Sequence, residues 1–285
     1  MSASVPDVAL CRVLLFTPGN RPERFAKAAA TGADGLILDL EDAVSLAGKD
    51  EARATLIEHF RAGHRRGLAA EQVCGLRVNN IHTPAGVRDL AALVSAGVAP
   101  DFILLPKVES AFEVRLYARL VAEVPLVCTI ESARGLEAAT AIANADPRVR
   151  AMAFGGVDLA ADLRAELAWE PLLWGRSRIV QAAATAGIAA IDVPHVVIDD
   201  VLGLRAEATR AKAMGYTAKL AIHPKQVPAV LEVFTPTPAE LERARGIVAA
   251  CEAAGGNVVE YQGKMVDGPV VKAAQQLLAR AGRAP

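Results

Sequence analysis

The chain has 285 residues, of which 53% are hydrophobic and 22% are charged. This composition supplies a large apolar core and excludes a disordered chain. The 31 basic and 32 acidic residues leave a formal charge of -1, so no net positive field could hold nucleic acid or an anionic membrane. We expect a globular protein that binds neither and that recognises anionic ligands at a local site.

No targeting or membrane-spanning segment is visible. The first residues, MSASVPDVAL, lack a basic segment followed by an apolar run, and no uninterrupted apolar stretch approaches about 18 residues. The four cysteines lie far apart without a C-x-x-C pair, which is typical of free thiols in a reducing compartment: Cys11, Cys74, Cys128 and Cys251. These features predict a cytoplasmic protein.

Short β-branched or Leu-rich runs alternate with longer Ala-rich amphipathic stretches along most of the chain. This alternation is typical of strand–helix units that form a parallel sheet covered by helices. Eight such units predict closure into a (β/α)8 TIM barrel, with a doubly wound open sheet as the alternative. The predicted strands are, in chain order, Val13 to Phe16, Leu36 to Asp39, Leu76 to Asn79, Phe102 to Leu105, Leu126 to Ile130, Ala151 to Phe154, Ala189 to Asp192 and Lys219 to Ile222.

Capping residues mark the helices between these strands. Thr83 and Pro84 form an N-cap and first-turn pair, and Ser110 and Ser132 each precede an Ala-rich or Leu-rich stretch. Glycines stand where helices should end: Gly32, Gly97, Gly187 and Gly215. The Pro-rich segment 234–238 predicts a boundary between a catalytic barrel of residues 1–234 and a C-terminal helical extension of residues 235–285.

Polar residues collect where the predicted strands end. In a barrel of this kind the active site is built at the C-terminal ends of the strands. Loops are polar in any protein, which accounts for residues such as Glu109 or Lys225. It accounts poorly for the acids placed directly at strand ends, namely Asp39, Glu131 and Asp192. This distribution predicts an active site at that rim.

Two acids at consecutive strand ends suggest a metal site. Glu131 and Asp158 offer hard oxygen ligands without a nearby His or Cys, a combination that suits Mg2+. A buried ion pair is the alternative for such acids. Gly155 and Gly156 would let a ligand approach the backbone closely, and N–H groups at the helix start near Asp158 could hold a carboxylate.

Arg77 lies inside an otherwise apolar strand, where a guanidinium is costly without an anionic partner. Glu41 or Asp42 could form a structural salt bridge with it, or a substrate carboxylate or enolate oxygen could bind it, and both could hold at once.

The sequence contains no nucleophile motif and no phosphate-binding Walker loop. Lys107, after the fourth predicted strand, could indicate a Schiff-base aldolase, but its P-K-V-E context also fits a phosphate or surface contact.

Seven segments follow one another in an order that is typical of one family. They are LLFTPGNRPERFAKAAATGADGLILDLEDAV, LRVNNIHTPAGVRDL, LLPKVES, TIESARGL, AFGGVDLAADL, LAIHPKQV and YQGKMVDGPVV. Together they resemble the citrate lyase beta-subunit family, which includes citryl-CoA, malyl-CoA and citramalyl-CoA lyases. LDLEDAV and GKMVDGPVV are specific to this group, whereas TIES and LLPK are shared with other 2-oxoacid aldolases.

The resemblance implies roles for the residues at the rim. Glu131 and Asp158 match the family's magnesium ligands, and Arg77 matches the arginine that binds the 2-oxoacid. Glu41 and Asp42 match acids that support this arginine and the water shell of the metal. Gly156, in the loop before Asp158, is expected to border the bound substrate. The same loop departs from the family's usual form, which has an acid or Thr before the metal aspartate.

Other parts of the chain acquire roles through the same resemblance. Asp267 resembles an acid on a C-terminal lid that reaches into a neighbouring subunit's site, which implies a homotrimer. Arg21, in the PGNRPER segment, matches a candidate contact to coenzyme A, although an ion pair at a helix start would explain it as well.

The resemblance implies a Mg2+-dependent carbon–carbon lyase that acts on a 3-hydroxyacyl thioester of coenzyme A. Mg2+ would chelate the hydroxyl and carboxylate of the substrate and lower the pKa of the hydroxyl, so that a base removes its proton. Cleavage of the carbon–carbon bond would then give a 2-oxoacid and a thioester enolate. Arg77 would stabilise oxygen charge, and Asp267 would protonate the enolate carbon. Two alternatives stay open: an aldolase acting on free hydroxyacids, and a non-catalytic or complex-dependent citrate lyase beta-like subunit.

Overall fold

Eight parallel strands close into a barrel because the last strand pairs with the first. The computed structural model describes residues 7–121 and 123–282, and in this part of the chain each strand of the barrel pairs with its neighbour in sequence. The strands are Val13–Pro18 (β1), Gly35–Asp39 (β2), Val73–Arg77 (β3), Ile103–Leu105 (β4), Leu126–Ile130 (β5), Val149–Phe154 (β6), Ala189–Asp192 (β7) and Ala218–Ala221 (β8). The predicted (β/α)8 fold is therefore confirmed.

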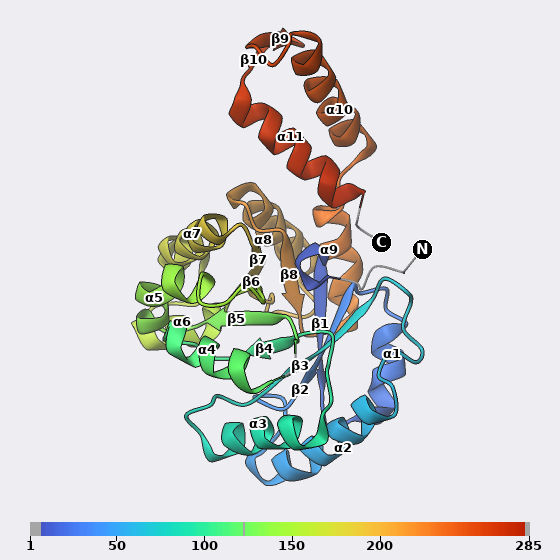
Figure 1. The fold of residues 1–285 in the computed structure, drawn as a ribbon, viewed down its shortest axis with the longest axis vertical. Coiled ribbons are helices and arrows are strands. Elements are labelled where there is room, and N and C mark those ends of the chain that lie inside the picture. Colours follow the sequence, from blue (N-terminus) through green and yellow to red (C-terminus); the bar gives the residue numbers. More distant parts are fainter. Residues whose placement is uncertain (1–6, 122, 283–285) are drawn as a thin grey trace. The chain divides into compact units, whose positions relative to one another are not determined.

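Helices surround the strands (Figure 1). The α-helices that accompany the barrel strands are Phe25–Ala29 (α1), Lys49–Arg61 (α2), Pro84–Ala96 (α3), Ala111–Leu120 (α4), Ala133–Ala143 (α5), Gly156–Leu163 (α6), Trp169–Ala186 (α7), Val201–Met214 (α8) and Val227–Phe234 (α9). Short 3-10 helices lie at Val8–Leu10 (η1), Pro22–Arg24 (η2), Leu46–Gly48 (η3) and Pro224–Gln226 (η4). Among the described residues, no helix has both the length and the apolar character needed to cross a bilayer.

Most of the predicted caps begin or end these helices, whereas α1 ends before Gly32, with Ala30 as its C-cap. The Thr83 hydroxyl accepts a hydrogen bond from the Gly86 amide at 3.0 Å, and the Ser132 hydroxyl accepts one from the Gly135 amide at 3.1 Å. Gly97 and two further glycines have the left-handed conformation that ends a helix, at the positions predicted: Gly187 and Gly215.

The third strand differs from the prediction. It runs over Val73–Arg77 instead of Leu76 to Asn79. Gly75 weakens the strand pattern in the sequence, yet the strand includes it because the Phe102 ring packs where a side chain would lie. An ideal Cβ at Gly75 would lie 2.4 Å from the Phe102 ring. Asn79 lies beyond the strand and is buried, and its side-chain amide donates to Asp89 Oδ2 at 2.6 Å. Asn79 therefore has a structural contact to α3.

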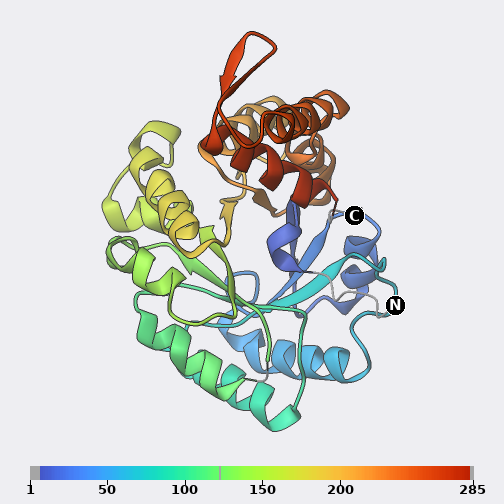
Figure 2. The same cartoon turned by 45° about the horizontal axis from the view of Figure 1, so that its top comes forward.

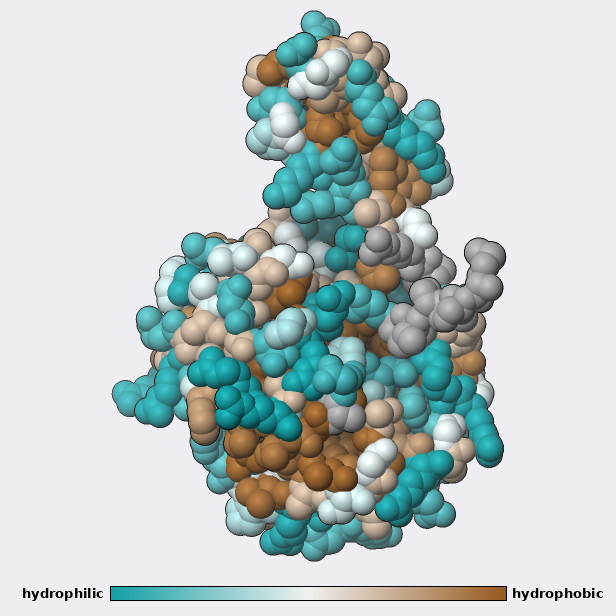
Figure 3. Space-filling view, viewed as in Figure 1, coloured by the Kyte–Doolittle hydropathy of each residue, from teal (hydrophilic) through white to brown (hydrophobic). Residues whose placement is uncertain are grey.

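The barrel strands bury apolar side chains on both faces, inside the barrel and towards the helices. Alternate strand residues point inward and fill the interior, among them Leu14, Ile37, Leu104 and Val127, together with Phe102 directly before β4. The intervening residues pack against the surrounding helices. Figure 3 shows apolar residues at the surface of this unit, where a small hollow between α3 and α4 is lined by Leu93, Val94, Val98 and Leu120.

Asp192, which was predicted to belong to the active-site rim, is instead a structural residue of the barrel wall. It is fully buried, and its carboxylate accepts hydrogen bonds from Lys219 Nζ at 2.6 Å and from Arg176 Nε at 3.2 Å. Arg176 lies on α7, so this ion cluster joins the barrel to its outer helices.

A second compact unit begins at Thr235, where the first unit ends with Phe234. It consists of Pro238–Ala253 (α10), an antiparallel hairpin of Val259–Tyr261 (β9) and Lys264–Val266 (β10), and Gly268–Ala281 (α11). The hairpin is visible in Figure 2. Thr237 and Glu240 form a capping box at the start of α10. The unit has its own small core, made by Ala244, Ile247, Val266 and Ala274.

We expect Gly75→Ala to lower the free energy of unfolding of the barrel by about 1 to 3 kcal/mol, because the added methyl group overlaps the Phe102 ring. Urea unfolding followed by circular dichroism measures this change. Gly268→Ala is the control, since a Cβ there meets nothing within 4 Å. Equal stability of the two variants would contradict the packing argument.

Candidate active site

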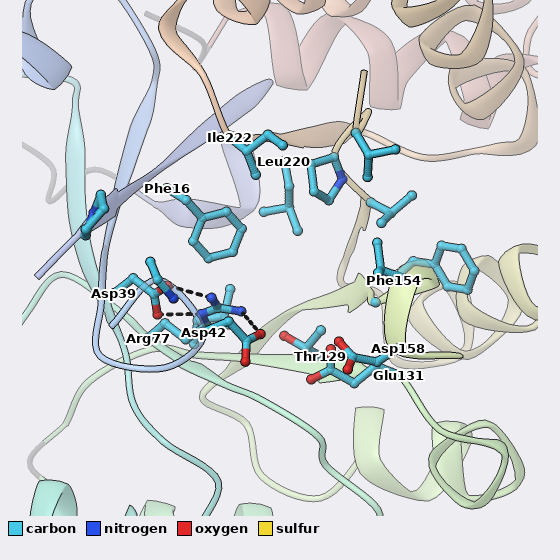
Figure 4. Close-up of a pocket in the computed structure, with 18 residues that line it drawn as sticks. Phe16, Asp39, Asp42, Arg77, Thr129, Glu131, Phe154, Asp158, Leu220 and Ile222 are labelled. Carbon is cyan, nitrogen blue, oxygen red and sulfur yellow. Dashed lines mark hydrogen bonds and ion pairs between the residues drawn. The ribbon is translucent and has the colours of Figure 1, made fainter. Parts of the chain in front are cut away.

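A cavity of about 390 Å3 lies at the C-terminal ends of the strands (Figure 4). Its polar lining comes from the ends of β2, β3 and β5 and from the start of α6: Asp39, Asp42, Arg77, Thr129, Glu131 and Asp158. Its apolar lining includes Phe16, Leu104, Val193, Pro194, Leu220 and Ile222. One half of the cavity is therefore charged and the other half is apolar.

Arg77 is held by acids on one side of the cavity. Its Nε and Nη2 donate to the two carboxylate oxygens of Asp39, each at 2.6 Å, and the dashed lines in Figure 4 mark this contact. Its Nη1 lies 3.0 Å from Glu41 Oε2 and 3.4 Å from Asp42 Oδ2. The guanidinium also lies 4.5 Å from the centre of the Phe16 ring. Burial works against the charge, but these acids outweigh it and raise the pKa of Arg77, which stays charged.

Asp39 is the main partner of Arg77, whereas the sequence pointed to Glu41 or Asp42. Asp39 and Arg77 are direct neighbours across β2 and β3, so both of their side chains face the barrel interior. The Asp39 carboxylate also accepts from the Glu41 amide at 2.8 Å and from the Ala43 amide at 3.1 Å. Its position at the end of the preceding strand was the available signal.

Glu131 and Asp158 lie close to each other in the close-up view, across the cavity from Arg77 (Figure 4). Glu131 follows β5, and its Oε1 accepts a hydrogen bond from the Lys107 amide at 2.6 Å. Burial, aided by the charges of Glu41 and Asp158, raises the pKa of Glu131 to about 8. The protein alone thus does not fully balance the negative charge of the Glu131 carboxylate, which is the state expected of a ligand for a cation.

Gly155 makes the space that Glu131 occupies. An ideal Cβ at Gly155 would lie 2.3 Å from Glu131 Cβ and 2.6 Å from Oε2, so any other residue would displace this carboxylate. Gly155 also borders the cavity. Gly156 begins α6 and is buried, and an ideal Cβ there would lie 2.8 Å from the Phe154 ring. A substrate contact of Gly156 stays a prediction.

Lys107 was not predicted to belong to this cluster. Its ammonium donates to Glu41 Oε1 at 2.9 Å, and its carbonyl accepts from Asn80 Nδ2 at 3.1 Å. Partial burial disfavours the charge, but the contact with Glu41 and the charges of Asp42 and Asp158 raise the pKa of Lys107. A Schiff base requires the neutral amine, so this environment favours an electrostatic role. Its place two residues after the end of β4 was the only sequence signal.

Thr129 was also missed. It lies two residues before Glu131 on β5 and lines the cavity. Its hydroxyl oxygen is buried and has no hydrogen-bond partner among the described residues. A buried polar group of this kind is available to a ligand or a water molecule.

Four predicted site residues lie outside the set that lines the cavity. Glu41 contacts the lining residue Arg77, and Gly156 directly follows the lining residue Gly155. The other two are Arg21 and Asp267. Arg21 is exposed beside η2, and its Nη1 lies 3.9 Å from Glu23 Oε1, the ion pair that the sequence offered as an alternative. Asp267 belongs to the second unit, where it is the N-cap of α11 and its Oδ1 accepts from the Val270 amide at 3.3 Å.

The donor set of the cavity fits Mg2+. Within residues 7–121 and 123–282, no three His, Cys, Asp or Glu side chains converge to enclose a metal ion. Mg2+ commonly takes only one or two protein carboxylates and leaves its other positions to water and substrate oxygens. Glu131 and Asp158 can provide that number, and the charged Arg77 across the cavity can bind an anionic oxygen.

Comparisons with known proteins agree with this geometry. The family described as HpcH/HpaI aldolase/citrate lyase matches residues 12–224. The citrate lyase subunit beta of Leuconostoc mesenteroides subsp. cremoris is 35% identical over 94% of this chain and 92% of its own length. The L-malyl-CoA/beta-methylmalyl-CoA lyase of Cereibacter sphaeroides is 36% identical over 95% of this chain and 94% of its own.

A solved structure is similar over almost the whole chain. CitE from Mycobacterium tuberculosis, in complex with magnesium, acetoacetate and coenzyme A, has a TM-score of 0.80 and 38% sequence identity, and the match covers 96% of this chain and 100% of the CitE chain. These similarities confirm the predicted resemblance and the class of carbon–carbon lyase. The chain belongs to the HpcH/HpaI aldolase/citrate lyase family.

Proposed function

We propose that the protein is a Mg2+-dependent lyase that cleaves, or in reverse forms, a short 3-hydroxyacyl-CoA thioester of the citryl, malyl or citramalyl type, with acetyl-CoA and a 2-oxoacid as products. The observation that carries this proposal is the placement of Glu131 and Asp158 opposite Arg77 in one cavity. The names of the relatives and the ligands of CitE, which are magnesium, acetoacetate and coenzyme A, support it.

Glu131 and Asp158 would hold the metal ion. Gly155 leaves room for the Glu131 carboxylate, whose pKa is raised by burial and by the nearby charges of Glu41 and Asp158. When bound, Mg2+ would polarise the hydroxyl and carboxylate oxygens of the substrate.

Arg77 would stabilise the negative charge that develops on oxygen during bond cleavage. Asp39 fixes the direction of its guanidinium, while Glu41 and Asp42 restrain Nη1. A group held in place in this way needs little reorganisation during the reaction. The apolar half of the cavity would exclude water from the short acyl chain and the enolate: Phe16, Leu104, Val193, Leu220 and Ile222.

Two further parts of the proposal concern regions outside the cavity lining. Asp267 would protonate the enolate carbon, supplied by the lid of a neighbouring subunit in a homotrimer. Arg21 would contact coenzyme A.

A cytoplasmic location stays a prediction from the cysteine usage.

A panel of malyl-, citramalyl- and citryl-CoA, assayed with and without Mg2+, tests the function. We expect the purified protein to release acetyl-CoA only with Mg2+, and Glu131→Gln and Asp158→Asn to lose at least about 100-fold of this activity. Glu137→Gln, at an exposed position on α5, is the matched control. Cleavage of free 4-hydroxy-2-oxoacids alone would favour the aldolase alternative, and activity only beside a transferase partner would favour the complex-dependent subunit.

The binding of Mg2+ is expected to tighten as the pH rises towards 8. The pKa of Glu131 in the folded protein lies above its ordinary value of 4.5. The free energy of unfolding therefore falls as the pH rises from about 4.5 to about 8, because Glu131 must then be charged in a buried place. Mg2+ needs that charged form and must displace the proton. Calorimetric titrations between about pH 6 and 9 should give a Kd that falls by up to about tenfold per pH unit and then levels off. A Kd that is independent of pH would remove Glu131 from the ligand set.

We expect Asp267→Asn to lower kcat by about 100-fold or more, because the amide cannot transfer the proton. Asparagine is as good an N-cap as aspartate, so α11 should be retained, which circular dichroism can check. Calorimetry should give nearly unchanged affinities for Mg2+ and pyruvate. A loss of either affinity would argue against the proton-transfer role.

A further inference from the structure

Lys107 combines an unusual backbone conformation with a central place in the site. It follows β4 with a φ of 51°, in the left-handed region that favours glycine. Among the described non-glycine residues only Arg164 and Gln262 share a positive φ. Such a conformation is kept where the surrounding contacts determine it, and such positions concentrate at functional sites.

This conformation lets Lys107 contact two groups of acids. Its backbone amide donates to Glu131 Oε1 at 2.6 Å. Its side chain turns to the other group, where Nζ donates to Glu41 Oε1 at 2.9 Å and lies 3.7 Å from Asp42 Oδ1. The same Nζ lies 3.9 Å from Asp158 Oδ1. The ammonium is therefore placed between the acids around Arg77 and the two proposed metal ligands.

Among the described residues, Arg77 is the other cation of the site, and its ion pairs are with the first group of acids alone. Arg77 forms its ion pairs with Asp39, Glu41 and Asp42. Asp158 forms its ion pair, within the described part of the chain, with the Lys107 side chain. In the protein without metal, its ammonium is thus the counter-charge beside the proposed ligands.

We propose that Lys107 is a positioning residue whose ammonium is the built-in counter-ion of this carboxylate cluster and thereby sets the affinity of the cluster for a divalent metal ion. The inference rests on the metal site proposed at Glu131 and Asp158. A divalent ion held by these carboxylates lies near the ammonium, and two cations repel at short range in a partly buried site. The metal ion must bind against that repulsion, so removing the ammonium strengthens metal binding.

Calorimetric titration with MgCl2 at pH 9, where protons compete least for the acids, tests the proposal. We expect the Kd for Mg2+ to fall by about tenfold or more in Lys107→Met. Lys107→Arg keeps the charge and should bind Mg2+ like the unsubstituted protein. Lys225→Met is the matched control, because the Lys225 ammonium pairs with Asp199 at the surface, and its Kd should not change.

Equal or weaker binding of Mg2+ by Lys107→Met overturns the proposal. Should this variant fail to fold without metal, Lys107→Gln, which retains a donor towards Glu41, is titrated in its place. The rise in unfolding temperature on adding Mg2+ must then also exceed that of the unsubstituted protein. Absence of Mg2+ binding in the unsubstituted protein would refute the proposed function, whereas binding without tightening in the neutral variants would refute only the role of Lys107.

Discussion

The paired charges of Arg77 and Asp39 are the constraint on which the site depends. They are direct neighbours on β2 and β3 and are joined by two hydrogen bonds of 2.6 Å inside the barrel. Because the Asp39 carboxylate is fully buried and the Arg77 guanidinium largely so, either charge would be costly without the other. Glu41 and Asp42 follow Asp39 in the chain after Leu40, and both lie close to Arg77, so this pair helps to set where these two acids lie.

A second ion cluster supports the opposite wall from behind. Lys219 is fully buried on β8, and its Nζ donates to Asp192, to Glu207 and to the carbonyl of Val193, each at 2.6 Å. Val193 belongs to the apolar half of the cavity. The two clusters have similar residues but different surroundings. The one behind β7 is enclosed by protein, whereas the one at the strand ends faces a cavity that a ligand can enter, and this difference separates a structural network from a functional one.

Much of this arrangement follows from the sequence because it depends on local patterns. Strand periodicity, capping residues and the acids Glu131 and Asp158 at strand ends predicted the barrel and two lining residues of its cavity. The errors, which are the place of Asp192 and the main partner of Arg77, depend on contacts between strands. Asp192 and Asp39 both end a strand, and only the pairing and the facing direction show that Asp192 contacts Lys219 and Asp39 contacts Arg77. The place of Lys107 depends on a left-handed backbone that its residue type does not predict.

The double use of the Asp39 carboxylate affects how this type of site can change during evolution. The same two oxygens orient Arg77 and accept the Glu41 and Ala43 amides that shape the following turn. A substitution at Asp39 would therefore disturb the loop and the arginine together, which leaves the charged half of the cavity little freedom to diverge. The apolar side chains of Val193 and Ile222 line the cavity without taking part in this charge network. Divergence towards new acyl groups is thus channelled to the apolar half, where changes of size leave the charge network intact.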